Sequence, residues 1–214
     1  MKPFFTREDT VWKRPNGCLH FYACPNPGEP IRETFTAMSE GLRAVPELGE
    51  QPAEHLHMTL QMLDAFTEDL ADERWQAVMS DLTAVIARQP AFHATFAAPS
   101  VRPYAVEAVG DPNPRWGDLV AALRGCLSEH GLSHTLTTPP YGPHYTVAYC
   151  RGLVPDDMVR LVLEPVARPT QFLVDSVALV AVDQHRDEAT YTFEVIRSWK
   201  LRPIDSSTPS SHEN

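Results

Sequence analysis

The sequence predicts an α+β fold with two pseudo-symmetric lobes, whose small antiparallel-rich sheets face a central cleft and carry helices on the outside. Short apolar strand patterns alternate with longer helical patterns along the chain. A motif-bearing strand is followed by a helix and a pair of strands in two successive parts of the sequence. The 214 residues, 43% of them hydrophobic, suit one core. We expect a domain over residues 17–200, between an irregular N-terminal arm (1–16) and a disordered tail (201–214).

The first half of the domain is predicted to alternate strictly between strand and helix. Residues 19–24 are apolar and aromatic and stop at a Pro-Asn-Pro-Gly turn, which is typical of a strand. Residues 31–45 repeat apolar side chains at helical spacing and are expected to form a helix. Residues 55–63 are predicted to be a second strand, and residues 68–88 a long helix with one apolar face.

The second half repeats the order of elements. Residues 91–97 and 101–109 are expected to pair as strands around a Pro-Ser turn. Residues 115–130 are predicted to form a helix that Gly131 ends, and residues 144–150 a strand. The remaining predicted elements are a short helix and two final strands: 155–163, 171–182 and 190–199.

Composition limits the class of protein. The formal net charge is −10 and there is no cluster of Lys and Arg, so we expect no grip on long nucleic acid. No apolar run is long enough to span a bilayer, and the first residues are charged where a signal peptide would be apolar. The four cysteines form no Cys-x-x-Cys pair and are expected to be reduced thiols. A cytoplasmic, monomeric protein is therefore expected.

Two tetrapeptides carry the candidate chemistry: His57-Met58-Thr59-Leu60 and His144-Tyr145-Thr146-Val147. In a strand, residues two apart point to the same face, so each imidazole is expected beside its own threonine hydroxyl. Imidazole exchanges a proton near neutral pH and serves as either acid or base. Two such pairs facing each other would hold a phosphate between two proton-transfer groups, with the hydroxyls donating to its oxygens.

The pattern alone does not select these two sites. A third His-x-Thr, His93-Ala94-Thr95-Phe96, is present, and with nine histidines in the chain such a motif arises by chance. Taken by itself, any one of these histidines could equally be a hydrogen-bonded structural residue.

A family resemblance separates the three motifs. The run 54–63, Glu-His-Leu-His-Met-Thr-Leu-Gln-Met-Leu, resembles the first motif of the 2H phosphoesterase superfamily, in particular the 2′-5′ RNA ligase and RNA 2′,3′-cyclic phosphodiesterase family. The run 143–149, Pro-His-Tyr-Thr-Val-Ala-Tyr, resembles its second motif, and the resemblance extends over residues 17–200. The family has no catalytic residue where His93 falls, so we assign His93 to structure.

The resemblance implies roles for the matching positions. His57 and His144 would be the acid and base, Thr59 and Thr146 would bind the phosphate, and no metal or cofactor would be needed. The activity implied is hydrolysis of a cyclic or 2′-5′-linked nucleotide or RNA-end phosphodiester. Tyr149 stands where many RNA-directed members carry Arg or Lys, which weakens the case for an RNA 2′,3′-cyclic substrate.

Other residues are candidates for binding substrate. Tyr141 precedes the second motif in a loop, where it would either stack on a base or close the edge of the core. His20 and Tyr22 share one face of the first strand and are candidates to line the cleft. Gln61 continues the face of His57 and Thr59. Arg151 lies on the opposite pleat from His144 and is an uncertain replacement for the missing cation.

Two alternatives remain open at this stage. His55-Leu56-His57 is a possible zinc-binding pair, which with a carboxylate such as Asp64 would make a metal-dependent hydrolase. The other alternative is a non-catalytic nucleotide-binding module of the same fold. Loss of activity on chelation would indicate the first, and binding without turnover the second.

Overall fold

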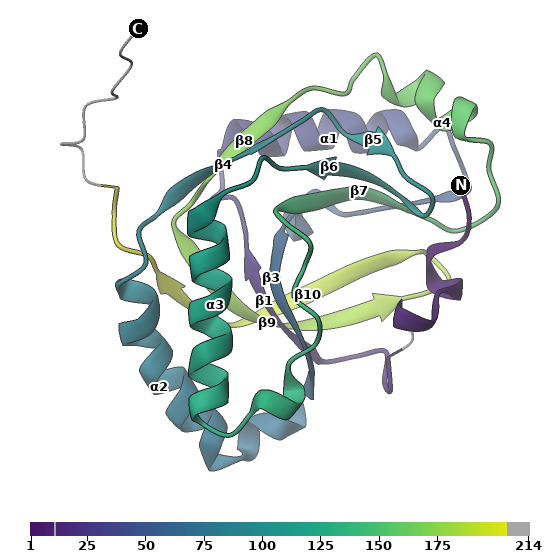
Figure 1. Ribbon diagram of the computed structural model, residues 1–214. Coiled ribbons are helices and arrows are strands. Elements are labelled where there is room, and N and C mark those ends of the chain that lie inside the picture. Colours follow the sequence, from purple (N-terminus) through teal and green to yellow (C-terminus); the bar gives the residue numbers. More distant parts are fainter. Residues whose placement is uncertain (11, 205–214) are drawn as a thin grey trace, which may run out of the picture.

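The computed structural model describes residues 1–10 and 12–204, which form three antiparallel sheets and four α-helices (Figure 1). We name the four-stranded sheet that contains the first histidine motif sheet A. Its strands, in spatial order, are β10 (Thr190–Lys200), β9 (Ser176–His185), β1 (Cys18–Ala23) and β3 (Met58–Phe66). Sheet A confirms the predicted first strand and the predicted last strand, while β3 is shifted along the chain from the predicted 55–63. The single strand predicted over 171–182 is wrong, because the chain divides there into β8 (Thr170–Val174), which lies outside sheet A, and β9.

Sheet B contains the second histidine motif. Its strands, in spatial order, are β2 (Leu48–Glu50), β7 (His144–Cys150), β6 (Ala105–Val109) and β5 (Ser100–Val101). The strands that follow each motif join the opposite sheet: β5 and β6 come after β3 but pair beside β7, and β9 and β10 come after β7 but pair beside β1. The α+β architecture of two antiparallel sheets is therefore confirmed, with both sheets built from strands interleaved along the chain.

The predicted pairing of 91–97 with 101–109 holds only at one end, where the Ala97 amide donates to the carbonyl oxygen of Val109 at 3.0 Å. β4 (Phe92–Phe96) instead pairs along its whole length with β8 (Thr170–Val174), forming a separate two-stranded sheet. The alternate residues of β4 are buried, and the ring of Phe96 stacks on that of Phe172 with centroids 5.9 Å apart. Cross-strand packing of this kind stabilises the pairing of β4 with β8, although the two strands are distant in sequence. The alternation of residues in the sequence shows only which face of a strand is buried and not which strand it pairs with.

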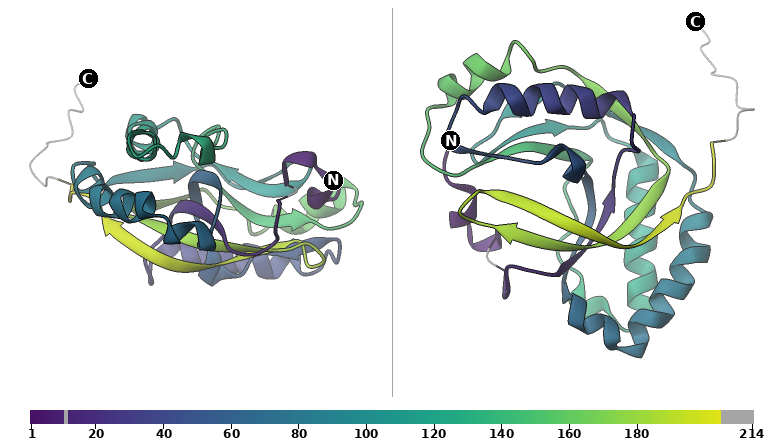
Figure 2. Two further views of the ribbon diagram at one scale, coloured as in Figure 1. Left: turned by 90° about the horizontal axis from the view of Figure 1, so that it is seen from below. Right: turned by 180° about the vertical axis from the view of Figure 1, so that it is seen from behind.

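Four helices cover the sheets: α1 (Pro30–Leu42), α2 (Glu73–Ala87), α3 (Pro114–Glu129) and α4 (Asp156–Leu163). α2 and α3 pack side by side at one end of the molecule, and α3 also contacts β3 (Figure 1). Seen from behind, α1 and the β9–β10 hairpin are in front of α3, so helices lie on both sides of the sheets (Figure 2). The predicted helix 68–88 begins only at Glu73, because the side chain of Asp72 caps α2 by accepting from the Arg74 amide, 2.9 Å away.

The two sheets meet at Gly49 in β2. Its Cα lies so close to the carbonyl oxygens of Glu188 and Ala189 that a Cβ would overlap both. These two residues end the turn of the β9–β10 hairpin (186–189), where Ala189 adopts a positive φ of 52°. Sheet B therefore touches the hairpin of sheet A through a position that only glycine fills without displacement.

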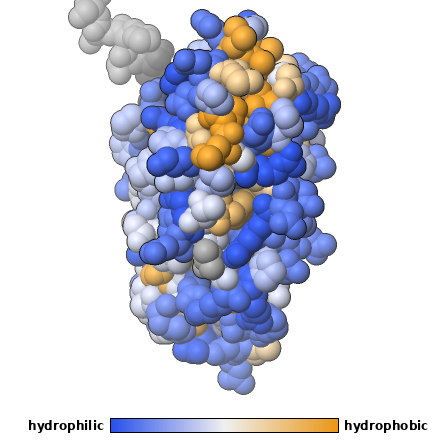
Figure 3. Space-filling view, turned by 90° about the vertical axis from the view of Figure 1, so that its right-hand side faces the viewer, coloured by the Kyte–Doolittle hydropathy of each residue, from blue (hydrophilic) through white to orange (hydrophobic). Residues whose placement is uncertain are grey.

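The surface is largely polar on the face that carries α4. An apolar patch lies at one end of this face (Figure 3), and the exposed large apolar side chains in and before α4 are Leu153, Met158 and Leu161. No helix in the described part of the chain is both long and apolar enough to cross a bilayer. All four cysteines are free, as expected. Leu201 and Arg202, predicted to begin the tail, are hydrogen-bonded to Asp175 and Gln89, and residues 205–214 lie outside the described residues.

Candidate active site

A cavity of about 410 Å³ lies between sheets A and B and collects residues from both histidine motifs. It brings together all the predicted site residues except Gln61. Those that line it are His20, Tyr22, His57, Thr59, Tyr141, His144, Thr146 and Tyr149. The two imidazoles, from strands far apart in the sequence, thus share one cavity that is open to ligand.

His57 lies immediately before β3 and is half-buried among aromatic rings. Its ring stacks on that of Tyr22, with centroids 3.8 Å apart, and meets the edge of Phe193 at 5.5 Å. Its Nδ1 is 2.7 Å from the carbonyl oxygen of His55. A carbonyl only accepts, so Nδ1 carries the proton and Nε2 presents a lone pair. Burial, opposed by the His55 hydrogen bond, lowers the pKa of His57 to about 4.

His144, the first residue of β7, repeats this arrangement in the other sheet. Its Nδ1 is 2.9 Å from the carbonyl oxygen of Gly142, two residues earlier in the chain as in the first motif. Its ring stacks on Tyr141, with centroids 4.6 Å apart. Tyr141, 70% exposed, therefore covers an imidazole on one side and faces solvent on the other. In both motifs a main-chain carbonyl fixes the ring and leaves Nε2 as the free nitrogen.

A β-bulge follows the threonine in each motif. On β3, Thr59 pairs with Tyr22 and Gln61 with Phe21, so Leu60 is an extra residue. On β7, Thr146 pairs with Glu107 and Ala148 with Val106, so Val147 is the extra residue. A bulge reverses the alternation of side chains beyond it.

The bulge in β3 makes the prediction for Gln61 wrong. Instead of continuing the cavity face, Gln61 is fully buried: its amide donates to the carbonyl oxygen of Thr137 at 3.2 Å, and its oxygen accepts from Arg124 at 2.6 Å. Met62 lines the cavity in its place. On β7 the matching bulge brings Tyr149, and not Ala148, to the cavity face.

The absent cation of the second motif is not supplied by Arg151. This residue follows β7, and its guanidinium donates to the carbonyl oxygen of Pro46 away from the cavity. Among the described residues that line the cavity, the one Lys or Arg side chain is Arg7, from the N-terminal arm. Arg7 is paired with Asp9 and lies over the rings of Phe4 and Tyr104.

His20 and Tyr22 share the cavity face of β1, as predicted, and bond to each other. Nδ1 of His20 is 2.8 Å from the hydroxyl of Tyr22. Burial, then the nearby charge of His57, lowers the pKa of His20 to about 3, so this imidazole is neutral. Its Nε2 is buried with no hydrogen-bond partner among the described residues.

The N-terminal arm contributes a wall that sequence reasoning missed. The predicted irregular segment contains two 3₁₀ turns, Phe4–Thr6 and Glu8–Thr10. Its residues on the cavity are Phe4, Arg7, Asp9, Thr10 and Trp12. The signal in the sequence was its concentration of aromatic side chains, which is unusual for an unpacked arm.

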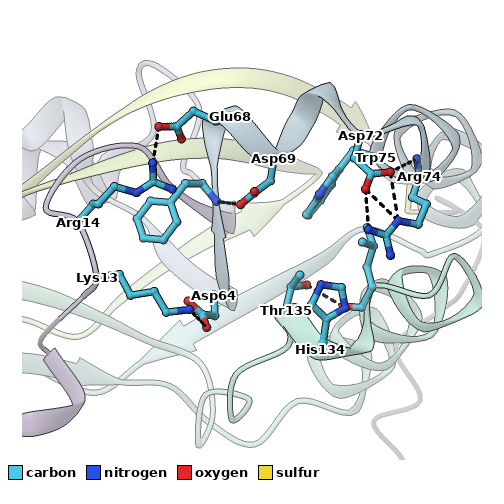
Figure 4. A pocket seen from close by; sticks show the side chains of 12 residues that line it. Lys13, Arg14, Asp64, Glu68, Asp69, Asp72, Arg74, Trp75, His134 and Thr135 are labelled. Carbon is cyan, nitrogen blue, oxygen red and sulfur yellow. Dashed lines mark hydrogen bonds and ion pairs between the residues drawn. The ribbon is translucent and has the colours of Figure 1, made fainter.

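The metal-dependent alternative is not favoured by the positions of its ligands. His55 Nδ1 accepts from the Phe193 amide at 3.3 Å, and Asp64 is paired with Lys13 at 2.7 Å. Asp64 lines a second cavity of about 480 Å³, where Arg14 and Arg74 are also each paired with a carboxylate (Figure 4). Within residues 1–10 and 12–204, no three His, Cys, Asp or Glu side chains are placed to hold a metal ion.

Two facing antiparallel sheets, each presenting a His-x-Thr motif to a shared cavity, are the arrangement expected of the two-histidine (2H) phosphoesterase superfamily. Comparison by sequence agrees, since the family described as the 2′-5′ RNA ligase superfamily matches residues 27–186. The chain belongs to the 2′-5′ RNA ligase superfamily. No curated protein matches it in sequence.

Solved structures support the same fold at low identity. TT0787 of Thermus thermophilus is similar, with a TM-score of 0.65 and 17% identity over 87% of this chain and 98% of that one. LigT of E. coli complexed with 3′-AMP has a TM-score of 0.58 and 21% identity over 87% of this chain and 98% of its own. LigT of E. coli complexed with ATP has a TM-score of 0.55 and 20% identity over 87% of this chain and 99% of its own. These likenesses show a shared fold.

Proposed function

We propose that the chain is a metal-independent phosphodiesterase that hydrolyses a cyclic or 2′-5′-linked phosphodiester of a small nucleotide or RNA end. The observation that carries this proposal is one cavity lined by both imidazoles and by Thr59 and Thr146, with Nδ1 of each imidazole bonded to a main-chain carbonyl so that Nε2 is left for substrate. The class of substrate is supported by E. coli LigT, whose structures are described as complexes with 3′-AMP, ATP and NADP⁺.

We propose different roles for the two histidines, and the surroundings of His57 support this proposal. His57 is kept neutral by burial, so its Nε2 is the general base that takes a proton from water. The water oxygen attacks phosphorus opposite the leaving oxygen, the bond from phosphorus to that oxygen breaks, and His144, as the general acid, gives the leaving oxygen a proton. From a 2′,3′-cyclic phosphate with the 3′ oxygen leaving, the product is a 2′-phosphomonoester.

The threonines are proposed to bind the non-bridging phosphate oxygens. Replacing either Thr59 or Thr146 with Val keeps the shape and removes one hydroxyl donor to a charged oxygen, an interaction worth about 1.5–3 kcal/mol. We expect kcat/KM to fall roughly 10- to 100-fold for each variant. Steady-state kinetics of Thr59→Val and Thr146→Val test this, with Thr95→Val in the third His-x-Thr as the matched control. Unchanged kinetics in both motif variants would show that the two threonine hydroxyls do not bind the phosphate.

The pH dependence of the reaction follows from the pKa of His57. The base must be deprotonated, so kcat/KM, which reports the free enzyme, is expected to fall as the pH drops through about 4. A bound phosphodiester anion favours protonated His57, so the acid limb of kcat is expected at higher pH than that of kcat/KM. Together with an alkaline limb from the acid, the profile is bell-shaped.

This profile is measured between pH 3.5 and 9, with circular dichroism at each pH to separate inactivation from unfolding. An acid limb of kcat/KM between pH 6 and 7 would assign the base to a group other than His57. A flat profile from pH 5 to 9 in both kcat and kcat/KM would contradict the paired mechanism.

The proposed function is tested by a turnover screen over 2′,3′-cyclic nucleotides, 2′-5′-linked oligonucleotides and cyclic ADP-ribose phosphate, each with and without EDTA. We expect turnover that EDTA leaves unchanged and that His57→Ala removes. Turnover abolished by EDTA would replace this proposal with the metal-dependent hydrolase. Binding of these compounds without turnover would make the chain a nucleotide-binding module.

A further inference from the structure

The N-terminal arm lies outside the family match, which begins at residue 27, yet it forms one wall of the active-site cavity. It is held in place by hydrogen bonds at both ends. The Lys2 amide donates to Pro103 at 2.7 Å, and the Gln184 side chain donates to the Thr10 carbonyl at 2.9 Å. The main-chain amide of Gln184 donates to the carbonyl oxygen of Pro15 at 2.7 Å. The wall is therefore a fixed part of this site and a feature that the family match does not cover.

The arm makes this end of the cavity aromatic. Phe4 packs on Tyr149, with ring centroids 4.3 Å apart, and Trp12 packs on Tyr191 at 5.4 Å with their planes 37° apart. All four of these side chains line the cavity. A cavity lined by flat rings favours a flat, heteroaromatic group over a charged phosphate.

The aromatic end is continuous with the catalytic end. Tyr22 stacks on His57 at 3.8 Å, and its hydroxyl is 2.8 Å from Nδ1 of His20. The ring of Trp12 lies 5.3 Å from that of His20, at 73°. The cavity volume, about 410 Å³, is near the lower end of the range for ligand pockets, roughly 300–1,000 Å³. This space suits one nucleotide with its phosphate at His57 and its base toward Trp12.

His20 adds a polar group to this end. Its Nε2 is buried without a hydrogen-bond partner among the described residues, and leaving a buried polar atom unpaired costs about 1–3 kcal/mol. His20 lines the cavity beside Trp12. The edge of a nucleobase carries both donors and acceptors, so a base that displaces a neighbouring side chain can satisfy Nε2 in either tautomer of His20.

We propose that this aromatic end of the cavity is a nucleobase subsite, with Trp12 of the arm as its stacking residue and His20 as its hydrogen-bonding residue. This inference rests on the proposed phosphodiesterase function of the same cavity. The arm then makes the enzyme selective for nucleoside phosphodiesters over phosphodiesters without a base.

The test compares kcat/KM for adenosine 2′,3′-cyclic phosphate and for ribose 2′,3′-cyclic phosphate, which lacks the base. Base stacking is worth about 1–3 kcal/mol, so we expect Trp12→Ala to lower the preference for the adenosine substrate roughly 10- to 100-fold. The matched control is Phe5→Ala: Phe5 is half-buried and packs 5.3 Å from Tyr191, but does not line the cavity. It should keep the wild-type preference.

A direct binding measurement separates this inference from the catalytic proposal. Calorimetric titration of adenosine 3′-monophosphate and of ribose 5-phosphate reports the subsite even in a protein that turns over neither cyclic substrate. We expect the wild type to bind the adenosine compound more tightly, and Trp12→Ala to lose that difference. An unchanged preference in Trp12→Ala, or an equal loss in Phe5→Ala, would overturn the subsite whether or not the chain is an active phosphodiesterase.

Discussion

Replacing His57 or His144 with Ala is expected to lower kcat roughly 10²- to 10⁴-fold, the contribution typical of one proton-transfer group. His57→Ala removes the group that accepts the proton of water, and His144→Ala removes the group that protonates the leaving oxygen. Single-turnover kinetics on the substrate found in the screen measure the loss in the chemical step. Because both groups act in one step, the kcat of the double variant is expected to be only slightly lower than that of the less active single variant.

His93→Ala is the matched control for these variants. His93 has the same His-x-Thr pattern but is exposed on β4, outside the active-site cavity. We expect its activity to equal that of the wild type, and the circular dichroism of all three variants to be unchanged. Wild-type rates in both His57→Ala and His144→Ala would refute the two-histidine mechanism.

Gly49→Ala is expected to destabilise the protein by roughly 3 kcal/mol, the upper end of the usual cost of overpacking. The added Cβ would overlap the carbonyl oxygens of Glu188 and Ala189, which are main-chain atoms and cannot rotate away. The hairpin turn or β2 would have to move, and the contact between the two sheets would open. Thermal unfolding should show a melting temperature lower by roughly 6–12 °C.

Gly125→Ala provides the control for this prediction. Gly125 is within α3, and a Cβ there would meet nothing within 4 Å. Alanine is a better helix former than glycine, so this variant is expected to be more stable by about 0.5–1 kcal/mol. If Gly49→Ala unfolds at the wild-type temperature, the turn at residues 188–189 is free to shift, and the sheets are not joined there.

The two candidate His-x-Thr pairs could be predicted from sequence because the pattern within each is local and the family resemblance set the third motif, at His93, aside. The placement of His57 beside Thr59, and of His144 beside Thr146, needs only the alternation of a strand, which holds over two residues. Beyond the threonines the prediction failed at Gln61, since a bulge at Leu60 is set by pairing with β1, a strand that lies far away in the sequence.

The partners of the strands and the role of the arm could not be predicted for the same reason. β4 has a regular alternation that fits either β8 or its neighbour in sequence, and only packing between Phe96 and Phe172 decides. The arm has no periodic pattern, so the sequence shows that it contains aromatic residues but does not show what they contact. Arg7 and Trp12 reach the cavity through contacts with residues from distant parts of the sequence.

The interleaving of strands between the two sheets has a consequence for how the molecule reaches its native state. β1 lies between β3 and β9 in sheet A, so one of its edges stays open until residues 176–185 are present. Contacts that join such distant segments carry a high entropic cost and slow folding. The cavity is therefore completed late, by the hairpin that also carries Tyr191. In a nascent chain both histidines would be synthesised before the cavity between the sheets can form.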